Sequence, residues 1–138
     1  MEMNTWHRGR LIDHIQLVVR DLEASKRFYS AVFEVLGIPM GEIGGFFYWD
    51  EFVISQGEPL TGRCHLAFQA KDHETVQRFH KAALAAGGKD NGAPGLRKEY
   101  HPGYYAAFVL DPDGNNIEAV HHGPAQRSAE SVVITAED

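Results

Sequence analysis

The hydrophobic positions in the first half of the chain follow two different periods. Within residues 11–19 the apolar side chains of Ile15, Leu17 and Val19 alternate with a more polar set, which is typical of a β-strand with one polar-lined face. After Asp21 the apolar positions recur at helical spacing until Gly37, so we expect a helix with Asp21 as its N-cap. Short strands are expected to follow at 46–49 and 52–55, with one more near 40–44.

The same order of patterns returns 51 positions later, where His65 falls on His14 and Asp72 on Asp21. A strand is expected again at 64–70, followed by a helix that Gly87 and Gly88 close and by a loop over 90–103. Other superimposed pairs are Arg27 and Arg78, Phe28 and Phe79, Ala31 and Ala82, and Gly37 and Gly88. The chain therefore contains two copies of one β-α-β-β-type module, which we expect to pair into one curved sheet with both helices on its outer face.

A β-hairpin is expected to close the second module. Residues 111–116 have the sequence Asp-Pro-Asp-Gly-Asn-Asn, and runs of apolar and aromatic residues lie on both sides of this turn. Glu118 follows the turn, between Ile117 and Ala119, as a single carboxylate in an otherwise apolar strand. A carboxylate buried there needs a partner that offsets its desolvation.

Strand alternation indicates what that partner is. Ile15 and Leu66 would face the helices, so His14 and His65 would share the opposite face of the sheet. We expect Glu118 to turn toward the same face, which would line one concavity with two imidazoles and a carboxylate, all held on strands rather than loops.

Two neutral imidazoles and one carboxylate with open positions suit a divalent ion such as Fe, Mn, Zn, Ni or Co. The alternative is that His14 and His65 are core histidines with protein partners and that Glu118 pairs with a nearby Arg or Lys. The equivalence of the two histidines in the repeat favours the metal site.

Composition narrows the function classes. The chain has 138 residues, 43% of them hydrophobic and 23% charged, which fits one compact domain. Its net charge of −6 makes nucleic acid an unsuitable partner. The single cysteine, Cys64, excludes an intrachain disulfide and suits a reducing compartment. The start of the chain lacks the apolar segment of a signal peptide, and no stretch approaches the roughly 20 apolar residues of a membrane span, so we expect a cytoplasmic protein without a membrane partner.

Residues 11–123 resemble the vicinal oxygen chelate superfamily, also called the glyoxalase/bleomycin-resistance/dioxygenase fold. The similarity lies in Asp-His-Ile-Gln-Leu-Val-Val at 13–19, in the helix start at 21–29, in Cys-His-Leu-Ala-Phe at 64–68 and in the hairpin from Phe108 to Glu118. It implies an α+β fold in which two paired βαβββ modules, 11–57 and 63–123, form a cup-shaped mixed sheet, with tails at 1–10 and 124–138. It also implies one divalent metal held by His14, His65 and Glu118, a small-molecule substrate and a homodimer, in which some members build each site from both chains.

Two positions depart from the best-known activities of that family. Val53 stands where a lactoylglutathione lyase would have a fourth ligand, a glutamate, and it cannot bind metal. Phe108 stands where fosfomycin-inactivating transferases carry a tyrosine. Extradiol dioxygenases match the ligand types, but their catalytic histidine and tyrosine cannot be placed in this chain. No catalytic residue is therefore assigned.

Four further residues are candidates for contact with a substrate. Tyr104 shares parity with Phe108, so it either points into the cup or packs as an aromatic at the start of its strand. Arg97 and Tyr100 lie in the expected loop before this strand, which either closes over a ligand, with Arg97 binding an anion, or stays a solvated surface loop.

Three functions remain open. The first is a metal-dependent isomerase, lyase or dioxygenase that polarises a small oxygen-rich substrate. The second is a binding protein of the same fold that sequesters a small molecule, as resistance proteins do. The third is an interaction module whose metal only stabilises the fold.

Overall fold

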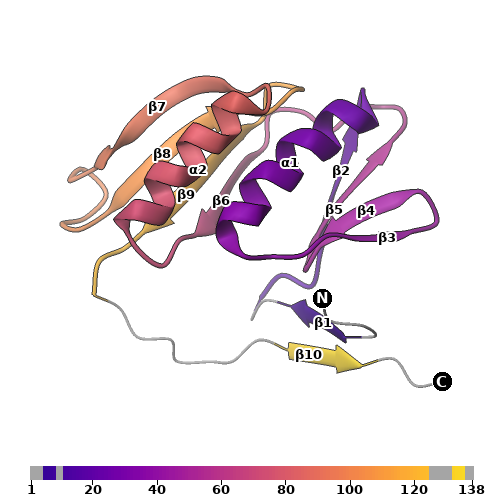
Figure 1. Ribbon diagram of the computed structural model, residues 1–138, viewed down its shortest axis with the longest axis horizontal. Helices are drawn as coiled ribbons and strands as arrows, with labels where there is room; N and C mark the ends of the chain where they lie inside the picture. The colour runs from indigo at the N-terminus through magenta and orange to yellow at the C-terminus, as the bar shows by residue number, and fades with distance from the viewer. Residues whose placement is uncertain (1–4, 9–10, 125–131, 136–138) are drawn as a thin grey trace.

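A computed structural model describes residues 5–8, 11–124 and 132–135, and Figure 1 shows their arrangement. Module one contains β2 (Ile15–Val19), α1 (Leu22–Leu36), β3 (Gly41–Ile43), β4 (Phe46–Trp49) and β5 (Phe52–Gln56). Module two contains β6 (His65–Gln69), α2 (His73–Ala85), β7 (Lys89–Leu96), β8 (Tyr105–Leu110) and β9 (Asn116–His121). The terminal strands β1 (Thr5–Arg8) and β10 (Val132–Thr135) pair with each other.

Each module forms its own four-stranded mixed sheet, with the strand order β2-β5-β4-β3 in the first and β6-β9-β8-β7 in the second. The first strand of each module runs parallel to the last strand, and the remaining pairs are antiparallel. The registers also match, because Gln16 pairs with Val53 while Ala67, 51 positions later, pairs with Glu118. The predicted α+β fold of two repeated βαβββ modules is confirmed, although the modules form two four-stranded sheets rather than the one continuous sheet that we expected.

The helix boundaries follow the capping signals. Asp21 caps α1 through a side-chain oxygen that accepts from the backbone N–H of Ala24, and Asp72 caps α2 in the same way with Thr75. Gly37 ends α1 with φ of 78°, the left-handed region that favours glycine.

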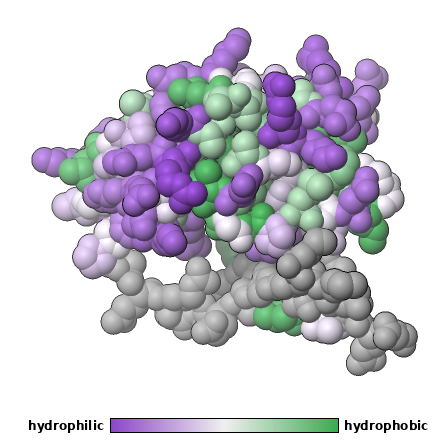
Figure 2. Space-filling view, viewed as in Figure 1, coloured by the Kyte–Doolittle hydropathy of each residue, from purple (hydrophilic) through white to green (hydrophobic). Residues whose placement is uncertain are grey.

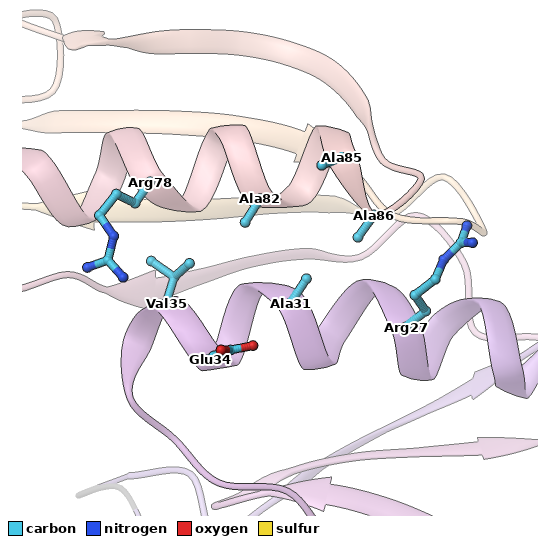
Figure 3. A pocket seen from close by; sticks show the side chains of 8 residues that line it. All are labelled: Arg27, Ala31, Glu34, Val35, Arg78, Ala82, Ala85 and Ala86. Carbon is cyan, nitrogen blue, oxygen red and sulfur yellow. The ribbon is translucent and has the colours of Figure 1, made fainter.

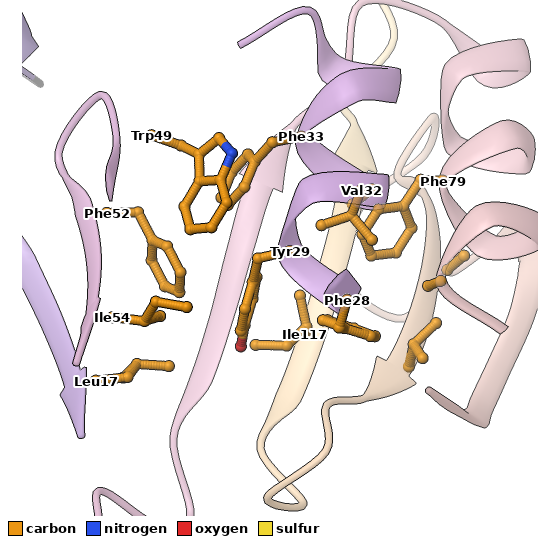
Figure 4. Close-up of a cluster of buried hydrophobic side chains, with 14 of the residues drawn as sticks. Leu17, Phe28, Tyr29, Val32, Phe33, Trp49, Phe52, Ile54, Phe79 and Ile117 are labelled. Atoms are coloured by element: carbon orange, nitrogen blue, oxygen red, sulfur yellow. The ribbon is translucent and has the colours of Figure 1, made fainter. Parts of the chain in front are cut away.

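The core joins both modules through aromatic side chains, which Figure 4 shows between the helices and the sheets. The ring of Phe33 on α1 lies 5.2 Å from that of Trp49 in its own module and 4.9 Å from that of Phe68 in module two. Phe28 and Phe79, equivalent in the repeat, are both fully buried. Burial of each such side chain contributes about 1.5–3 kcal/mol. As expected from strand parity, Ile117 and Ala119 also face this core.

The two modules run in opposite directions. The backbone N–H of Arg20, just after β2, lies 3.4 Å from Oδ2 of Asp113, in the turn before β9, and Asn116 donates to the carbonyl of Cys64 just before β6. The end of β2 is therefore near the start of β6. Figure 1 shows the same relation, with β2 and β6 pointing opposite ways on either side of α1.

The prediction of a loop over 90–103 was wrong for its first part, which belongs to β7 up to Leu96. Its residues include Gly92, Pro94 and Gly95, which weaken a strand signal, and the pairing with β8 shifts register at Gly92 and Gly95. Because β7 is an edge strand, it tolerates both proline and bulges. Neither helix within the described residues is long and apolar enough to cross a membrane.

Candidate functional site

Glu118 lies at the centre of the second sheet. Its strand, β9, is flanked by β6 and β8, and Glu118 itself is paired with Ala67 on one side and Phe108 on the other. Glu118 is only 1% exposed. Its side chain lies on the face of the sheet opposite α2. Because this carboxylate is buried, the identity of its partners decides whether its charge is compensated.

Both carboxylate oxygens of Glu118 have a partner. Nε2–H of His65 donates to Oε1 at 2.8 Å, and the hydroxyl of Tyr104 donates to Oε2. Burial, followed by the hydrogen bond and the charge of Glu118, raises the pKa of the Tyr104 hydroxyl above its usual value. Tyr104 therefore keeps its proton and remains a donor at neutral pH. The alternative in which Glu118 pairs with Arg or Lys is wrong for the described part of the chain, where its ion-pair partner is His65.

His14 lies away from this pair within the single chain. It precedes β2, and the two modules bring the end of β2, rather than its start, near the start of β6, where His65 lies. Nδ1 of His14 lies 2.7 Å from Oδ1 of Asp13, and 58% of its side chain is exposed. Accordingly, among the described residues no group of three or more His, Cys, Asp or Glu side chains is placed to hold a metal ion.

The His65–Glu118 pair nevertheless fits two ligands of one ion. Ligand atoms about 2.1 Å from a metal and at right angles to each other are roughly 3.0 Å apart, close to the observed 2.8 Å between Nε2 and Oε1. The His65 side chain is 53% exposed, so that it is accessible to an ion from solvent, whereas Glu118 is a buried charge that a cation would compensate. Exposure at both His14 and His65 also argues against the alternative that they are core histidines.

The predicted substrate residues cluster around the pair. The ring of Phe108 lies 6.0 Å from that of His65, and the Arg97 guanidinium lies 5.4 Å above the Phe108 ring. Arg97 also donates to the carbonyl of Ala93 at 2.7 Å. Tyr100 is 61% exposed, with its ring 4.9 Å from that of Tyr104. One face of the sheet thus carries Arg97, Phe108 and Tyr104 beside His65 and Glu118.

Sequence reasoning missed a histidine pair next to Tyr104. Nε2 of His101 lies 2.9 Å from Nδ1 of His122, and both rings pack edge-on against the Tyr104 ring, with centroids 5.4 and 5.2 Å away. His122 has the same strand parity as Glu118, which was a usable signal, but the contact with His101 depends on how the preceding loop folds. His121, of opposite parity, contacts His73 on the helix side.

A groove of about 440 Å³ lies between α1 and α2, on the far side of module two from Glu118. Figure 3 shows Arg27 and Arg78 at its opposite ends and alanines between them. In Figure 2, which looks onto the helices, weakly and strongly hydrophobic residues, in pale and dark green, lie along the middle of the view between purple hydrophilic areas. Arg27 with Arg78 and Ala31 with Ala82 are repeat-equivalent pairs, so this groove marks the symmetric contact of the two modules.

Comparison with known proteins places these features in a family. The model of the Glyoxalase/Bleomycin resistance protein/Dioxygenase superfamily matches residues 39–119. The uncharacterized protein YqjT of Bacillus subtilis is 34% identical over 127 residues, covering 78% of this chain and 95% of YqjT. The crystal structure of a glyoxalase/bleomycin resistance protein from Albidiferax ferrireducens is 35% identical with a TM-score of 0.69, covering 78% of this chain and 95% of that one. A mutant of the fosfomycin resistance protein FosX from Listeria monocytogenes, complexed with Mn(II) and a dihydroxypropylphosphonic acid, shares the fold at 24% identity, with a TM-score of 0.60 and coverage of 84% and 92%.

Proposed function

Because the chain belongs to the Glyoxalase/Bleomycin resistance protein/Dioxygenase superfamily, we propose that it is a divalent-metal-dependent enzyme acting on a small oxygen-rich molecule in the cytoplasm. The observation that carries this proposal is the buried Glu118 carboxylate, 2.8 Å from the accessible His65 imidazole. A buried carboxylate next to an imidazole, both on rigid strands, provides two of the ligands that a metal site needs. The reaction is an isomerisation, a lyase reaction or a dioxygenation.

The third ligand in this proposal is His14 of a second copy. This assignment is supported by the position of His14 before β2, whose end rather than start is near His65, and by the finding that no group of three or more ligand side chains gathers among the described residues. Leu11, three residues before this histidine, is 89% exposed and belongs to a groove of about 280 Å³ that also includes Leu66 and Phe68 of the edge strand β6. Exposed apolar residues beside an uncharged edge strand are expected to be covered. A two-fold dimer would exchange His14 in both directions and create two equivalent sites.

The remaining residues would bind and orient the substrate. A bound Fe, Mn, Zn, Ni or Co ion would supply Lewis-acid polarisation of substrate oxygens, and the Mn(II) in FosX gives one precedent for this fold. Arg97 would bind an anionic group of the substrate, because its guanidinium is held above Phe108 on the same face as Glu118. Phe108 and Tyr104 would exclude water from one side, and the exposed Tyr100 would border the entrance.

Metal titration tests the proposal. Metal-free protein should bind one divalent ion per chain, and His65→Ala and Glu118→Ala should each lose that binding. His80→Ala is a matched control, because His80 lies on α2, on the other side of the sheet from Glu118. Its imidazole hydrogen-bonds Asp90 at 2.9 Å. A wild-type protein that binds none of the five ions would defeat the proposal.

Subunit mixing tests the shared site. In a heterodimer of His14→Ala with Glu118→Ala, one site carries both substitutions and the other carries neither. A fully exchanged equal mixture should therefore recover about a quarter of the wild-type metal sites. If each site were formed within one chain, the mixture would recover none.

A sequestering protein of the same fold is the second candidate. The observation that favours it is that His65 and Glu118 already satisfy each other by a 2.8 Å hydrogen bond, so the face is stable without a metal. Screening small anionic, oxygen-rich compounds separates the two functions. An enzyme converts its ligand, whereas a sequestering protein releases it unchanged.

A further inference from the structure

The two oxygens of Glu118 differ in the partners that they meet. Oε1 faces the imidazole of His65, while Oε2 accepts the hydroxyl hydrogen of Tyr104. The Glu118 side chain is 2% exposed, so solvent does not compete for either oxygen. The carboxylate therefore has one oxygen on the side of the proposed metal and one oxygen committed to a phenol.

Tyr104 is fixed in place by its surroundings. Its backbone N–H donates to the carbonyl of His101 at 3.2 Å, and its carbonyl accepts from the N–H of Arg97 at 2.7 Å. Rings of Tyr100, His101 and His122 contact its ring, with centroids 4.9, 5.4 and 5.2 Å away. Movement of the hydroxyl away from Oε2 would therefore disturb these backbone hydrogen bonds and ring contacts.

The His101–His122 pair contacts the ring of Tyr104 and helps to hold it in place. Nδ1–H of His101 donates to the carbonyl of Pro102 at 2.9 Å, which leaves its Nε2 as the acceptor for Nδ1–H of His122. Each ring is thus held by a hydrogen bond as well as by its contact with Tyr104. Both histidines have a structural reason to lie next to the tyrosine.

We infer that Tyr104 is a positioning residue that restricts Glu118 to binding a metal through Oε1 alone. Carboxylates bind metals through one oxygen or through both, and a hydrogen bond that occupies the second oxygen favours the one-oxygen mode. One more position on the ion then stays open to water or to a substrate oxygen. This inference rests on the proposed function, and it explains how a site with few protein ligands keeps room for a substrate that binds through two oxygens.

Water-proton relaxation by bound Mn(II) measures the number of exchangeable waters on the ion and thus tests the inference. With three single-atom protein ligands, a six-coordinate ion keeps three waters. In Tyr104→Phe the freed Oε2 should also bind, so the relaxation enhancement per bound ion should fall by about a third. Tyr104→Met removes the same donor with different packing and should give the same fall.

Tyr105→Phe is the matched control, because the Tyr105 hydroxyl contacts Gln77 on the helix side and provides neither of the hydrogen bonds to Glu118. Its relaxation enhancement should equal that of the wild type. An unchanged enhancement in folded Tyr104→Phe or Tyr104→Met, with Mn(II) bound, would overturn the inference and leave the proposed function intact. Failure of the wild type to bind Mn(II) or any of the other ions would overturn both.

Discussion

The hydroxyl of Tyr29 on α1 donates a 2.5 Å hydrogen bond to Oδ2 of Asp111, which begins the turn between β8 and β9. This contact crosses from module one to module two, and Tyr29 is fully buried. Oδ1 of Asp111 accepts from the backbone N–H groups of Asp113 and Asn115, and Asn115 in turn accepts from the N–H of Cys64. One carboxylate thus holds the hairpin turn, the start of β6 and the first helix together.

Removing the Tyr29 hydroxyl should destabilise the whole protein. Tyr29→Phe leaves a buried, charged Asp111 with one donor fewer, and a hydrogen bond to a charged group contributes about 1.5–3 kcal/mol. Burial and the nearby Asp111 raise the pKa of Tyr29 well above its usual value, so the hydroxyl keeps its proton and remains a donor at neutral pH. Urea unfolding of Tyr29→Phe should show a loss of that size.

Tyr105→Phe serves as the control. Its hydroxyl accepts from Nε2 of Gln77 at 2.9 Å in an exposed position, where the loss should stay within about 0.5 kcal/mol. Equal losses in the two variants would contradict the role assigned to the Tyr29–Asp111 contact.

Gly88→Ala should destabilise by overpacking. A methyl group there would lie 2.5 Å from Cγ1 of Val109 and 2.7 Å from Cε1 of Phe28, both in the buried core. Inserting an atom into a packed core costs about 1–3 kcal/mol. Gly62→Ala is the control, because its Cβ meets nothing within 4 Å. Thermal unfolding should place Gly88→Ala well below Gly62→Ala, and a normal melting temperature for Gly88→Ala would refute the packing argument.

These positions show how far the sequence repeat leads. The repeat superimposes Gly37 on Gly88, and both glycines follow a helix, as predicted. Their physical roles differ, however. Gly37 has φ of +78° and open space around it, whereas Gly88 is needed for close packing and Gly87 takes the positive φ of +102°. Periodicity and caps therefore give the elements, and the contacts between them require the structure.

The candidate site has the same limit. Parity alone placed Glu118 and His65 on one face, because both lie on strands whose alternation is clear. It could not give the distance between His14 and His65, since that depends on how the two modules pack, with β2 and β6 in opposite directions. Likewise, the partner of Oε2 of Glu118 depends on how residues 97–104 fold, and the apolar periodicity of that segment is weak.

Asp72 should make the stability of α2 sensitive to acid. The hydrogen bond from the Thr75 hydroxyl, and then the one from its backbone N–H, lowers the folded-state pKa of Asp72 below the usual value of 3.8. The charged form is thus favoured by folding. Its contribution is fully present above the unfolded-state pKa and is lost as the pH falls through the lower, folded-state pKa.

Asp72→Asn keeps a capping side chain without a titrating group. The melting temperature of the wild type relative to Asp72→Asn should therefore decline as the pH falls below about 4, while other carboxylates titrate in both proteins. Thr75→Val, which removes the stronger of the two hydrogen bonds, should shift the midpoint of this decline upward. Parallel acid profiles for wild type and Asp72→Asn would exclude the capping charge as a cause.

Val53 offers a gain-of-function test of the repeat. It pairs with Gln16 as Glu118 pairs with Ala67, so a glutamate there would project from module one as Glu118 does from module two. The face is already polar, because Nε2 of Gln16 donates to Oγ of Ser55 at 2.7 Å.

If His14 of one copy completes the site of the other, Val53→Glu adds a carboxylate from the same module as His14. We expect Ni(II) to bind about tenfold more tightly, or about 1.4 kcal/mol. Val53→Gln, equal in size but uncharged, should gain less, and equal Ni(II) affinity in the two variants would show that a carboxylate at position 53 does not reach the metal site.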